Sequence, residues 1–305
     1  MVSAQTVTPI ATPGVATADA ANVLPRRGPR SRAWRSLSRN PVALASLVFL
    51  VVVHLTAFIG PLAFTMSPEE IFPLPKFSPP DGVHLLGIDE SGRDVFARML
   101  HGGRVSLGVG LASVVLSVVL GCLVGAVGGY FRGWQEHVLM RFTDALMALP
   151  TFFLLLIVLA IFGGGVTTLI VVVGLTSWMG VARLVRGEVL RWREREFVEA
   201  ARALGASDRR IIVYHLLPQA IPSIIVASTL GVAAAILSEA AMSYLGLGIA
   251  PPAASWGNLL MNAQNYLYAA PRLAVFPGLM ILLTVLAYNS LGDGLRDALD
   301  PEATR

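Results

Sequence analysis

The stretch from Val105 to Phe131, VSLGVGLASVVLSVVLGCLVGAVGGYF, contains 27 residues and no charged side chain. A helix needs about 20 predominantly apolar residues to cross the hydrocarbon core of a bilayer, so this stretch can span a membrane. The whole chain agrees, because its 305 residues are 55% hydrophobic and 14% charged, with a mean hydropathy of +0.68. Soluble domains carry about 25% charged residues. The composition excludes a soluble globule, a disordered chain and a nucleic-acid-binding protein, and indicates an integral membrane protein.

Five further stretches resemble this one in length and composition, which makes six predicted spans. They are Val42–Phe64, Val105–Phe131, Val138–Phe162, Val166–Ala182, Ala220–Ala241 and Leu273–Leu291. They are apolar on all sides rather than striped, as lipid-embedded helices are. We therefore predict an all-α integral membrane fold with six transmembrane helices and both termini on one side.

The arginines decide which side that is. If the N-terminus is cytoplasmic, 18 of the 23 Lys and Arg residues lie on the cytoplasmic side and 5 on the other. Cytoplasmic loops are enriched in Lys and Arg, so this asymmetry predicts an N-in, C-in topology. No cleavable signal peptide is expected, since the first apolar run is too long and begins too far from the N-terminus.

The predicted organisation has four parts. Residues 1–40 form a largely disordered cytoplasmic tail, residues 41–103 hold the first span and an extracytoplasmic loop, residues 104–293 hold five helices, and residues 294–305 form a cytoplasmic tail. We expect no catalytic and no metal-binding residues, because Cys122 is the single cysteine and the five histidines lack metal-ligand spacing. The glycine-rich strings lack the lysine of a phosphate-binding loop.

The long cytoplasmic loop, residues 183–219, is predicted to contain two short helices. The first covers Phe197–Leu204, and Gly205 would end it in a conformation with positive φ. Asp208 or its neighbour Ser207 would cap the second, and Pro218 would end it. A helical hairpin tied to two spans is suited to being held by a cytoplasmic partner.

The same loop carries a spaced motif. It reads Glu199-Ala200-Ala201, three residues, Gly205, nine residues, His215, one residue, and Leu217-Pro218. This pattern resembles the EAA loop of bacterial ABC-importer permeases, with one departure, because His215 stands where the family pattern has isoleucine. In that family the loop is the coupling helix that sits in a cleft of the ATPase subunit. The resemblance thus assigns ATPase coupling to Glu199, Ala200, Ala201, Gly205, Leu217 and Pro218.

Other blocks narrow the resemblance to permeases of the dipeptide/oligopeptide family, C type. They are Arg39-Asn40-Pro41, His84–Val95 with Gly103–Leu107, and Leu237–Ala240 followed by Leu245–Gly248, Pro251-Pro252 and Ser255–Gly257. The resemblance covers roughly residues 36–300. It implies the type I ABC-importer permease fold and a location in the bacterial cytoplasmic membrane.

The resemblance also implies partners. These are a second permease subunit of the B type, two ATP-binding cassette subunits that hold ATP and Mg, and an extracytoplasmic peptide-binding protein. The chain itself would bind no cofactor and, as a transport subunit rather than an enzyme, would contact the lipid bilayer and no nucleic acid. The expected cargo is a dipeptide or oligopeptide. Nickel, glutathione and haem, which similar systems carry, also stay open as cargo.

For some single residues the sequence leaves two roles open. Glu239, near the outer end of the fifth predicted span, either lines a translocation path or gate, or makes hydrogen bonds at a helix end. Arg93 and Asp94 lie on the polar face of a short predicted helix, Gly92–Leu100, which would rest on the outer leaflet and could contact the binding protein.

Three further features favour structural roles. Arg141 and Asp144, three residues apart, are predicted to pair with each other at the membrane boundary. The repeat of Gly121, Gly125 and Gly129 predicts close helix packing. Three prolines are predicted to kink their spans, at Pro150, Pro222 and Pro277.

Two other classes of protein fit the sequence less well. An ion-coupled secondary transporter is expected to show several intramembrane carboxylates or histidines, and only Glu239 and His54 lie well within the predicted spans. A membrane-embedded enzyme would need a cluster of nucleophile, base and metal ligands, which the sequence does not present.

Overall fold

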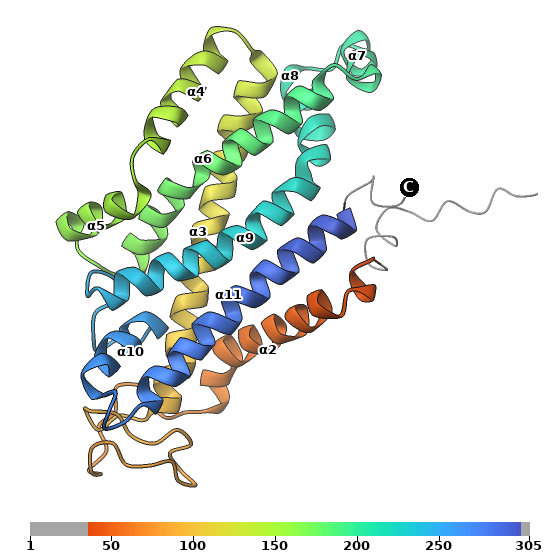
Figure 1. Ribbon diagram of the computed structural model, residues 1–305. Helices are drawn as coiled ribbons and strands as arrows, with labels where there is room; N and C mark the ends of the chain where they lie inside the picture. The colour runs from red at the N-terminus through yellow and green to blue at the C-terminus, as the bar shows by residue number, and fades with distance from the viewer. Residues whose placement is uncertain (1–35, 300–305) are drawn as a thin grey trace, which may run out of the picture.

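A computed structural model describes residues 36–299 of the chain, and in this range it contains helices and no strand (Figure 1). The tails 1–35 and 300–305 lie outside the described residues, and so does most of the predicted N-terminal tail. Five long helices run through the bundle: α2 (Pro41–Ala63), α3 (Val95–Phe131), α6 (Val166–Arg193), α9 (Leu217–Tyr244) and α11 (Arg272–Leu299). The shorter elements are α4 (Trp134–Met147), α5 (Thr151–Phe162), α7 (Glu196–Ala203), α8 (Asp208–Arg210), the π-helical segment η1 (Ile211–Leu216), α10 (Trp256–Ala263) and the 3-10 turn η2 (Gln264–Tyr266).

The five long helices are apolar enough to cross a membrane, and α4 and α5 together make a sixth candidate span. The prediction of one straight third span over Val138–Phe162 was wrong in detail, because α4 and α5 meet at an angle of 81°. Pro150 lies at the break. Its ring disfavours helical geometry at Leu149, and it supplies no N–H to the helix. The predicted kink at Pro150 is therefore a full break.

The helix α3 begins earlier than predicted. The expected interfacial helix Gly92–Leu100 is not separate, because residues from Val95 onward form the first turns of the 37-residue helix α3. Asp94 caps this helix, since its Oδ1 accepts a hydrogen bond from the N–H of Ala97 at 2.7 Å. Gly102 and Gly103 lie inside this helix, and their lack of a side chain lets the first turn of α10 pack closely against it.

The pair of α3 and α6 forms the centre of the bundle, and its contact is the most extensive between any two helices. A Cβ added at Gly121 would lie 2.5 Å from Val181 Cβ. A Cβ added at Gly125 would lie 2.4 Å from the carbonyl oxygen of Ala182. At Gly129 it would lie 2.9 Å from a β-carbon of α6. The predicted packing role of the three glycines is thus confirmed.

The helix α6 also ends later than predicted, at Arg193 instead of Ala182. Its last turns carry charged side chains that extend the helix beyond the apolar part of the span. This shortens the cytoplasmic loop. The predicted loop 183–219 therefore contains the end of α6, the short helix α7, and the segments α8 and η1 that lead into α9.

Pro218 does not end a helix. The segment from Asp208 runs through η1 into α9 as one apolar rod of 37 residues. Proline lacks the N–H that an α-helical turn needs and crowds the preceding turn, and a wider π-helical turn relieves both. In η1 the N–H of Leu217 bonds to the carbonyl of Ile212, five residues earlier. The predicted helix end at Pro218 was therefore wrong.

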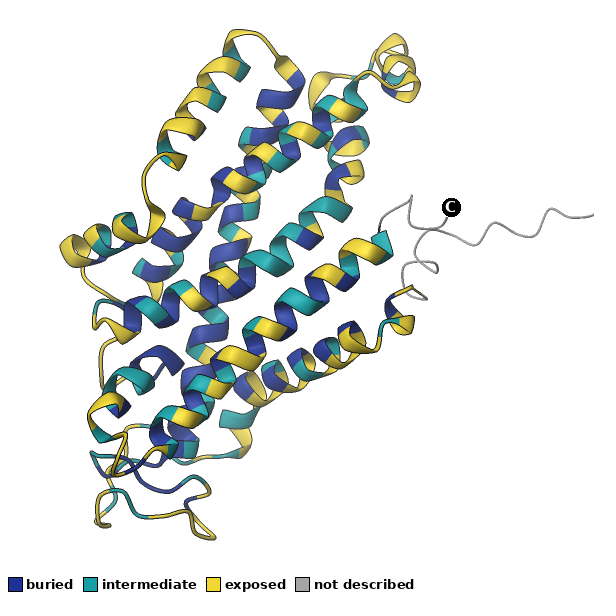
Figure 2. Cartoon of the chain, viewed as in Figure 1, coloured by how far each residue is buried: buried dark blue, intermediate teal, exposed yellow. Residues whose placement is uncertain are grey.

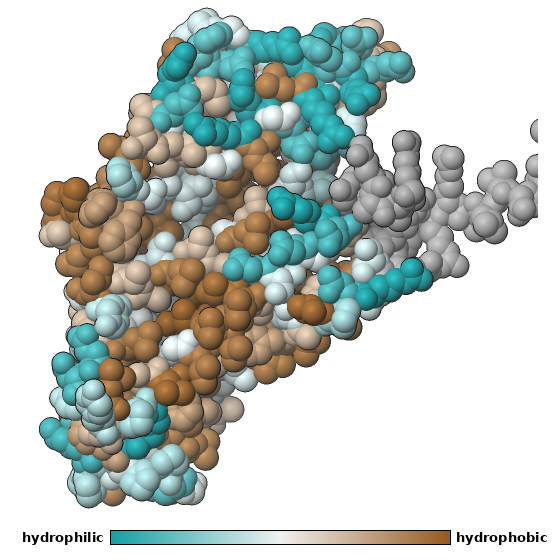
Figure 3. Space-filling view, viewed as in Figure 1, coloured by the Kyte–Doolittle hydropathy of each residue, from teal (hydrophilic) through white to brown (hydrophobic). Residues whose placement is uncertain are grey.

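The two ends of the bundle differ. The first turn of α2 lies beside the last turns of α11, because a Cβ on Gly294 would lie 2.4 Å from Ala43 Cβ. These ends share a side of the molecule with α7, and the segment 64–94 lies on the opposite side with α10 (Figure 1). An even number of spans requires this arrangement. A broad apolar band lies between more polar ends (Figure 3).

The helices α2 and α11 form one edge of the bundle. Most of the large side chains on the outer face of α2 are exposed aliphatic residues, as a lipid-facing helix requires (Figure 2). One polar contact joins the pair inside the span. His54 Nδ1 lies 2.7 Å from the carbonyl oxygen of Leu50, and His54 Nε2 lies 3.0 Å from the hydroxyl of Tyr288.

Candidate functional site

The spaced motif lies on the hairpin formed by α7, the turn after it, and α8 with η1. The side chains of Glu199 and Ala200 are exposed on α7, and Ala201 is half-buried. At the other end of the motif Leu217 is half-buried and Pro218 is exposed. The structure thus brings the motif residues together at one end of the bundle, next to the ends of α3 and α6 (Figure 1).

The turn after α7 has the geometry that Gly205 was predicted to supply. Gly205 has a φ of +81°, and a Cβ built there would meet nothing within 4 Å. The N–H of Gly205 bonds to the carbonyl of Arg202, and the N–H of Ala206 bonds to the carbonyl of Ala201, both at 3.0 Å. These two bonds form a Schellman motif, which satisfies the last carbonyls of the helix. Glycine is thus favoured here by the positive φ of the backbone and not by the closeness of a neighbouring atom.

The inner face of the hairpin is anchored in a small apolar cluster. Val198 of α7 and Ile211 and Leu216 of η1 are fully buried. They pack against residues from the cytoplasmic ends of α3 and α6, namely Ala126, Tyr130, Val185 and Val189. Burial of an aliphatic side chain stabilises by about 1.5–3 kcal/mol. The hairpin is therefore held against the spans rather than hanging free.

Polar contacts reinforce this anchoring. The hydroxyl of Tyr130, at the end of α3, donates to Asp208 Oδ1 at 2.5 Å. Arg132, just after the end of α3, pairs at 2.6 Å with Glu194, the residue that follows α6, and so joins the two spans that carry the hairpin. The second pair is exposed on both sides and contributes little to stability. Ser207 takes the N-cap position of α8 as predicted, but its side chain makes no capping bond, and Asp208 faces Tyr130 instead.

The outer face of the hairpin is exposed and partly apolar. Leu204 is 88% exposed and Tyr214 is 73% exposed, although both are large side chains. Phe197 and Val213 add to this surface, and Glu199 lies on the same short helix as Phe197. Exposed apolar side chains gathered at one end of a molecule mark an interaction surface. His215, which departs from the family pattern, is half-buried on η1.

At the other end of the bundle Glu239 is fully buried between helices. Its Oε2 accepts a hydrogen bond from the hydroxyl of Ser106 on α3 at 2.6 Å, and its Oε1 accepts one from Ser243 on α9 at 2.7 Å. Of the two roles considered for Glu239, these contacts describe hydrogen bonding between helices. In this conformation the side chain faces no open path.

The same two hydroxyls hold the first residue of α10 and the segment that leads to it. Ser106 Oγ accepts from the N–H of Trp256 at 3.1 Å, and Ser243 Oγ accepts from the N–H of Ile249 at 3.0 Å. A Cβ on Gly257 would lie 2.6 Å from the carbonyl oxygen of Ala240, so α10 lies directly against α9. Glu239 is therefore the centre of a buried network that joins α3, α9 and α10.

The two residues predicted to contact a binding protein have different surroundings. Asp94 is fully buried, where it caps α3 and its Oδ2 lies 2.8 Å from His84 Nδ1. Arg93 is half-buried, and its N–H donates to Asp89 Oδ1. Asp94 thus organises the segment before α3 and presents no surface to a partner in this conformation.

The predicted pair of Arg141 and Asp144 does not form. Asp144 pairs with Arg183 of α6 instead. A second pair, between Glu136 and Arg186, also joins α4 to α6. Both acids lie on the face of α4 that packs against α6, so they meet the cations of the neighbouring helix rather than one on their own.

The sequence interpretation missed two cations that the loop before α3 holds at the extracytoplasmic end, the buried Arg98 and the half-buried Arg272. Arg98 is 1% exposed and its Nη1 donates to Asp89 Oδ2 at 2.5 Å. Arg272 donates to the carbonyls of Phe77 and Ser78 at 2.8 Å. Charged residues that flank a span are expected at the membrane interface, and nothing in their spacing shows that a folded loop covers them. Among residues 36–299 no group of three His, Cys, Asp or Glu side chains could hold a metal ion.

An anchored cytoplasmic hairpin on a bundle of five or six membrane spans defines a class, the membrane-embedded permease subunit of an ABC importer. Residues 117–305 match the family described as "Binding-protein-dependent transport system inner membrane component". Residues 28–80 match the "N-terminal TM domain of oligopeptide transport permease C". The chain belongs to this family of ABC-importer permeases, of the C type, and is a multi-pass protein of the bacterial inner membrane.

Individual relatives agree over most of the chain. The glutathione transport system permease protein GsiD of Pectobacterium atrosepticum is 39% identical over 277 residues, which are 90% of this chain and 92% of the relative. The dipeptide transport system permease protein DppC of Alkalihalophilus pseudofirmus is 35% identical over 274 residues, 90% of each chain. A chain of the inward-facing MetNI methionine ABC transporter aligns with a TM-score of 0.50 and 20% identity. That alignment covers 68% of this chain and 96% of the other, and it confirms the fold.

Proposed function

We propose that this permease moves dipeptides or oligopeptides across the membrane after an extracytoplasmic peptide-binding protein has delivered them. Two separate ATP-binding cassette subunits would bind ATP with Mg and hydrolyse it. The names of the relatives support a peptide cargo, since they include dipeptide and glutathione systems. Family membership supports the need for other ABC components.

The hairpin carries this proposal, because it is anchored on one face and exposed on the other. Buried Val198, Ile211 and Leu216 fix it to the ends of α3 and α6, so a force on the hairpin reaches the spans. Exposed Leu204 and Tyr214 leave an apolar surface that a partner would cover. In the proposed mechanism α7 enters a cleft of the ATPase subunit, and closure of the two ATPase subunits on ATP moves both hairpins together.

A second permease subunit of the B type is part of the same proposal. A pore lined by one such bundle would be open on one side, so a second bundle is needed to close it. The two hairpins would then engage the two ATPase subunits, one each. Arg93 remains the candidate for contact with the binding protein, since Asp94 is buried.

Glutathione is a second candidate cargo with a specific observation in its favour. A relative with 39% identity is a glutathione permease, and glutathione is itself a tripeptide. To identify the cargo, the intact complex would be purified with its binding protein, and the bound ligand identified by mass spectrometry. A peptide or glutathione supports the proposal. Nickel or haem on the binding protein would contradict a peptide cargo and identify the transported molecule directly.

The coupling role is tested by Glu199→Gln against a matched control, Glu196→Gln. Both acids are exposed and lie in the first turn of α7, where a negative charge favours the helix by about 0.3–1 kcal/mol. Only Glu199 belongs to the spaced motif. A charge-assisted hydrogen bond in the ATPase cleft would contribute about 1.5–3 kcal/mol. We expect Glu199→Gln to lower ATPase retention and substrate-stimulated ATP hydrolysis about tenfold or more, and Glu196→Gln to leave both near wild type.

Equal effects of the two variants would reduce Glu199 to a helix-dipole contribution and remove it from the coupling site. Transport that continues without ATP, driven by an ion gradient, would instead support a secondary transporter and contradict the whole proposal.

A further inference from the structure

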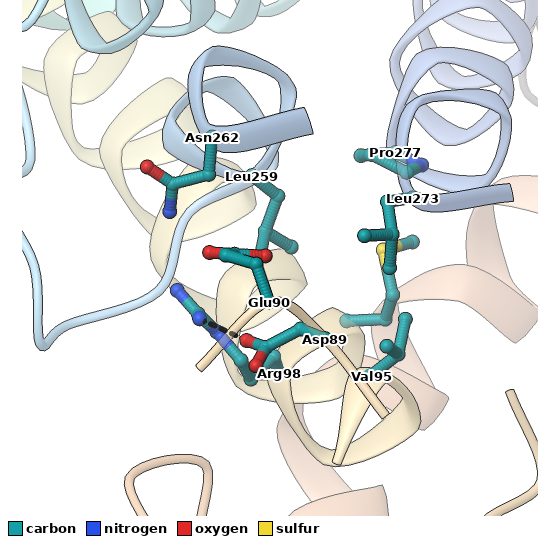
Figure 4. Close-up of a pocket in the computed structure, with 9 residues that line it drawn as sticks. Asp89, Glu90, Val95, Arg98, Leu259, Asn262, Leu273 and Pro277 are labelled. Carbon is teal, nitrogen blue, oxygen red and sulfur yellow. Dashed lines mark hydrogen bonds and ion pairs between the residues drawn. The ribbon is translucent and has the colours of Figure 1, made fainter. Parts of the chain in front are cut away.

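A small cavity with a few polar side chains in a mainly apolar wall lies at the extracytoplasmic end of the bundle, where four elements meet (Figure 4). Glu90 comes from the segment before α3, Arg98 from α3, and Asn262 from α10. Apolar side chains complete the wall, including Leu273 and Pro277 of α11. Figure 4 shows the side chains of Glu90, Arg98 and Asn262 on the same side of the cavity.

Arg98 is the unusual residue of this cavity. It is 1% exposed, and one of its nitrogens, Nη1, donates to Asp89 Oδ2. Its Nε and Nη2 are also buried and have no hydrogen-bond partner among the described residues. Buried donors almost always have a partner, which is either protein or ordered water. No protein atom satisfies two N–H groups of this buried guanidinium, so a partner other than protein is required.

Asp89 does not supply that acceptor. Its Oδ1 accepts from the N–H groups of Ser91 and Arg93, at 2.7 and 2.9 Å, and its Oδ2 accepts from Arg98 Nη1. Glu90 and Asn262 line the cavity without a hydrogen bond to another side chain of the described part. The cavity thus has two buried unpaired donors on Arg98, and the partly buried side chains of Glu90 and Asn262 bring acceptor oxygens to its wall.

The surrounding charges select the kind of ligand. An added anion would face the carboxylates of Asp89 and Glu90, and an added cation would face the guanidinium of Arg98. A neutral group that accepts a hydrogen bond from Arg98 and donates hydrogen bonds to oxygens of Glu90 and Asn262 fits all three side chains. The space holds about one water molecule, and a buried water needs two to four polar partners.

We propose that this cavity is a built hydration site, in which one ordered water accepts from Arg98 Nε or Nη2 and donates to Glu90 and to Asn262 Oδ1. The water completes the hydrogen bonding of Arg98 and links the segment before α3 to α10. Partial burial raises the pKa of Glu90, with Asp89 adding to the effect, which agrees with a carboxyl group at the wall of this cavity.

The test is a high-resolution map of the permease purified with its associated subunits, at a resolution that shows ordered water. We expect a density peak within hydrogen-bond distance of Arg98 Nε or Nη2 and of a Glu90 oxygen. An empty cavity would overturn the proposal, and so would a Glu90 side chain bonded directly to Arg98 or a peak with the coordination of a metal ion.

A pair of variants strengthens the test. Asn262→Leu keeps a side chain of similar size but removes the amide, and we expect the peak to weaken or disappear. Asn265→Leu, at an exposed position three residues further along, should leave the peak unchanged. An undiminished peak in Asn262→Leu would show that Asn262 takes no part in the site. Neither outcome depends on which cargo is transported, so the site stands or falls independently of the proposed function.

Discussion

Substitution of Gly205 isolates the contribution of backbone conformation to the hairpin. The residue has a φ of +81°, and no atom lies within 4 Å of the position that a Cβ would take. A larger side chain therefore meets no steric obstacle in this chain, and its cost comes from the left-handed conformation alone. Asparagine adopts that conformation more readily than alanine does, and β-branched valine adopts it least. The series Gly205→Asn, Gly205→Ala and Gly205→Val should be progressively more damaging.

The magnitude follows from the cost of the left-handed region. For residues other than glycine this cost is about 1–2 kcal/mol, with asparagine below that range and valine at or above its upper end. A loss of 1 kcal/mol corresponds to roughly a fivefold change in an equilibrium and 2 kcal/mol to roughly thirtyfold. This free energy is lost from the Schellman motif, whose two bonds are donated by the N–H groups of Gly205 and Ala206.

Amide hydrogen exchange measures that loss directly. Local opening of the turn exposes the N–H of Ala206, so its protection should fall about fivefold in Gly205→Ala and about thirtyfold in Gly205→Val. The measurement is made on the permease without its ATPase subunits, so that contacts with a partner do not contribute. Substrate-stimulated ATP hydrolysis of the assembled complex should then decline in the same order.

Equal protection of Ala206 in all three variants would refute the reasoning, because it would show that the turn does not depend on a glycine conformation. Unchanged protection together with lost ATP hydrolysis would mean that the side chain collides with a partner, and that the backbone of this chain is not responsible.

Three further predictions concern the spans and the extracytoplasmic end. Replacing Glu239 with leucine leaves two buried serine hydroxyls without an acceptor, which costs about 1–3 kcal/mol of folding stability for each hydroxyl. The change should therefore lower the melting temperature of the purified permease far more than replacement with glutamine does. Gly125→Val places a Cβ 2.4 Å from a carbonyl oxygen of α6 and should reduce the yield of folded protein, whereas the same change at Gly108, where a Cβ meets nothing within 4 Å, should be tolerated. Glu90→Gln should stabilise the protein relative to wild type at neutral pH but not near pH 4. The pKa of Glu90 is raised by its partial burial and by Asp89, with Arg98 offsetting part of this, so its ionisation costs folded-state stability as pH rises. A melting-temperature difference that does not change with pH would contradict this.

The sequence predicted the spans well because hydrophobic length is a local property. Each predicted apolar run lies on a helix of the structure, with the third run divided between two. The helix ends were predicted less accurately, since α3 begins at Val95 instead of Val105 and α6 continues to Arg193 instead of ending at Ala182. Both extensions carry charged residues that a hydropathy pattern assigns to loops. Some of these charges have tertiary partners: Arg98 of α3 is buried against Asp89, and Arg183 and Arg186 of α6 pair with acids of α4. Such contacts leave no periodic signal.

The parts of the hairpin that depend on residues close together in the sequence could be predicted. The spacing placed α7 within one residue of its observed bounds and identified Gly205 as the residue that ends it. The π-helical turn before Pro218 was not predicted, because a proline usually ends a helix and the sequence does not show that the chain will widen its turn instead.

The buried polar networks could not be predicted, because their members are far apart in the chain. Ser106 and Glu239 are separated by 133 residues, and Tyr130 and Asp208 by 78. A single sequence does not show which hydroxyl will meet which carboxylate at such distances. The one signal was the cost of a carboxylate within a span, which requires a partner for Glu239 without identifying it.

These networks meet on one helix. The 37 residues of α3 span about 55 Å, and both ends of the helix carry buried contacts. Tyr130 at the cytoplasmic end binds the hairpin. At the other end Ser106 belongs to the Glu239 network, and Arg98 lines the cavity beside α10. Between them, the glycine repeat holds α3 so closely against α6 that neither helix can slide or rotate without a collision. We therefore expect a displacement of the hairpin to carry α3 and α6 along as one body, and α10, whose first N–H bonds to Ser106 of α3, to follow at the opposite face of the membrane.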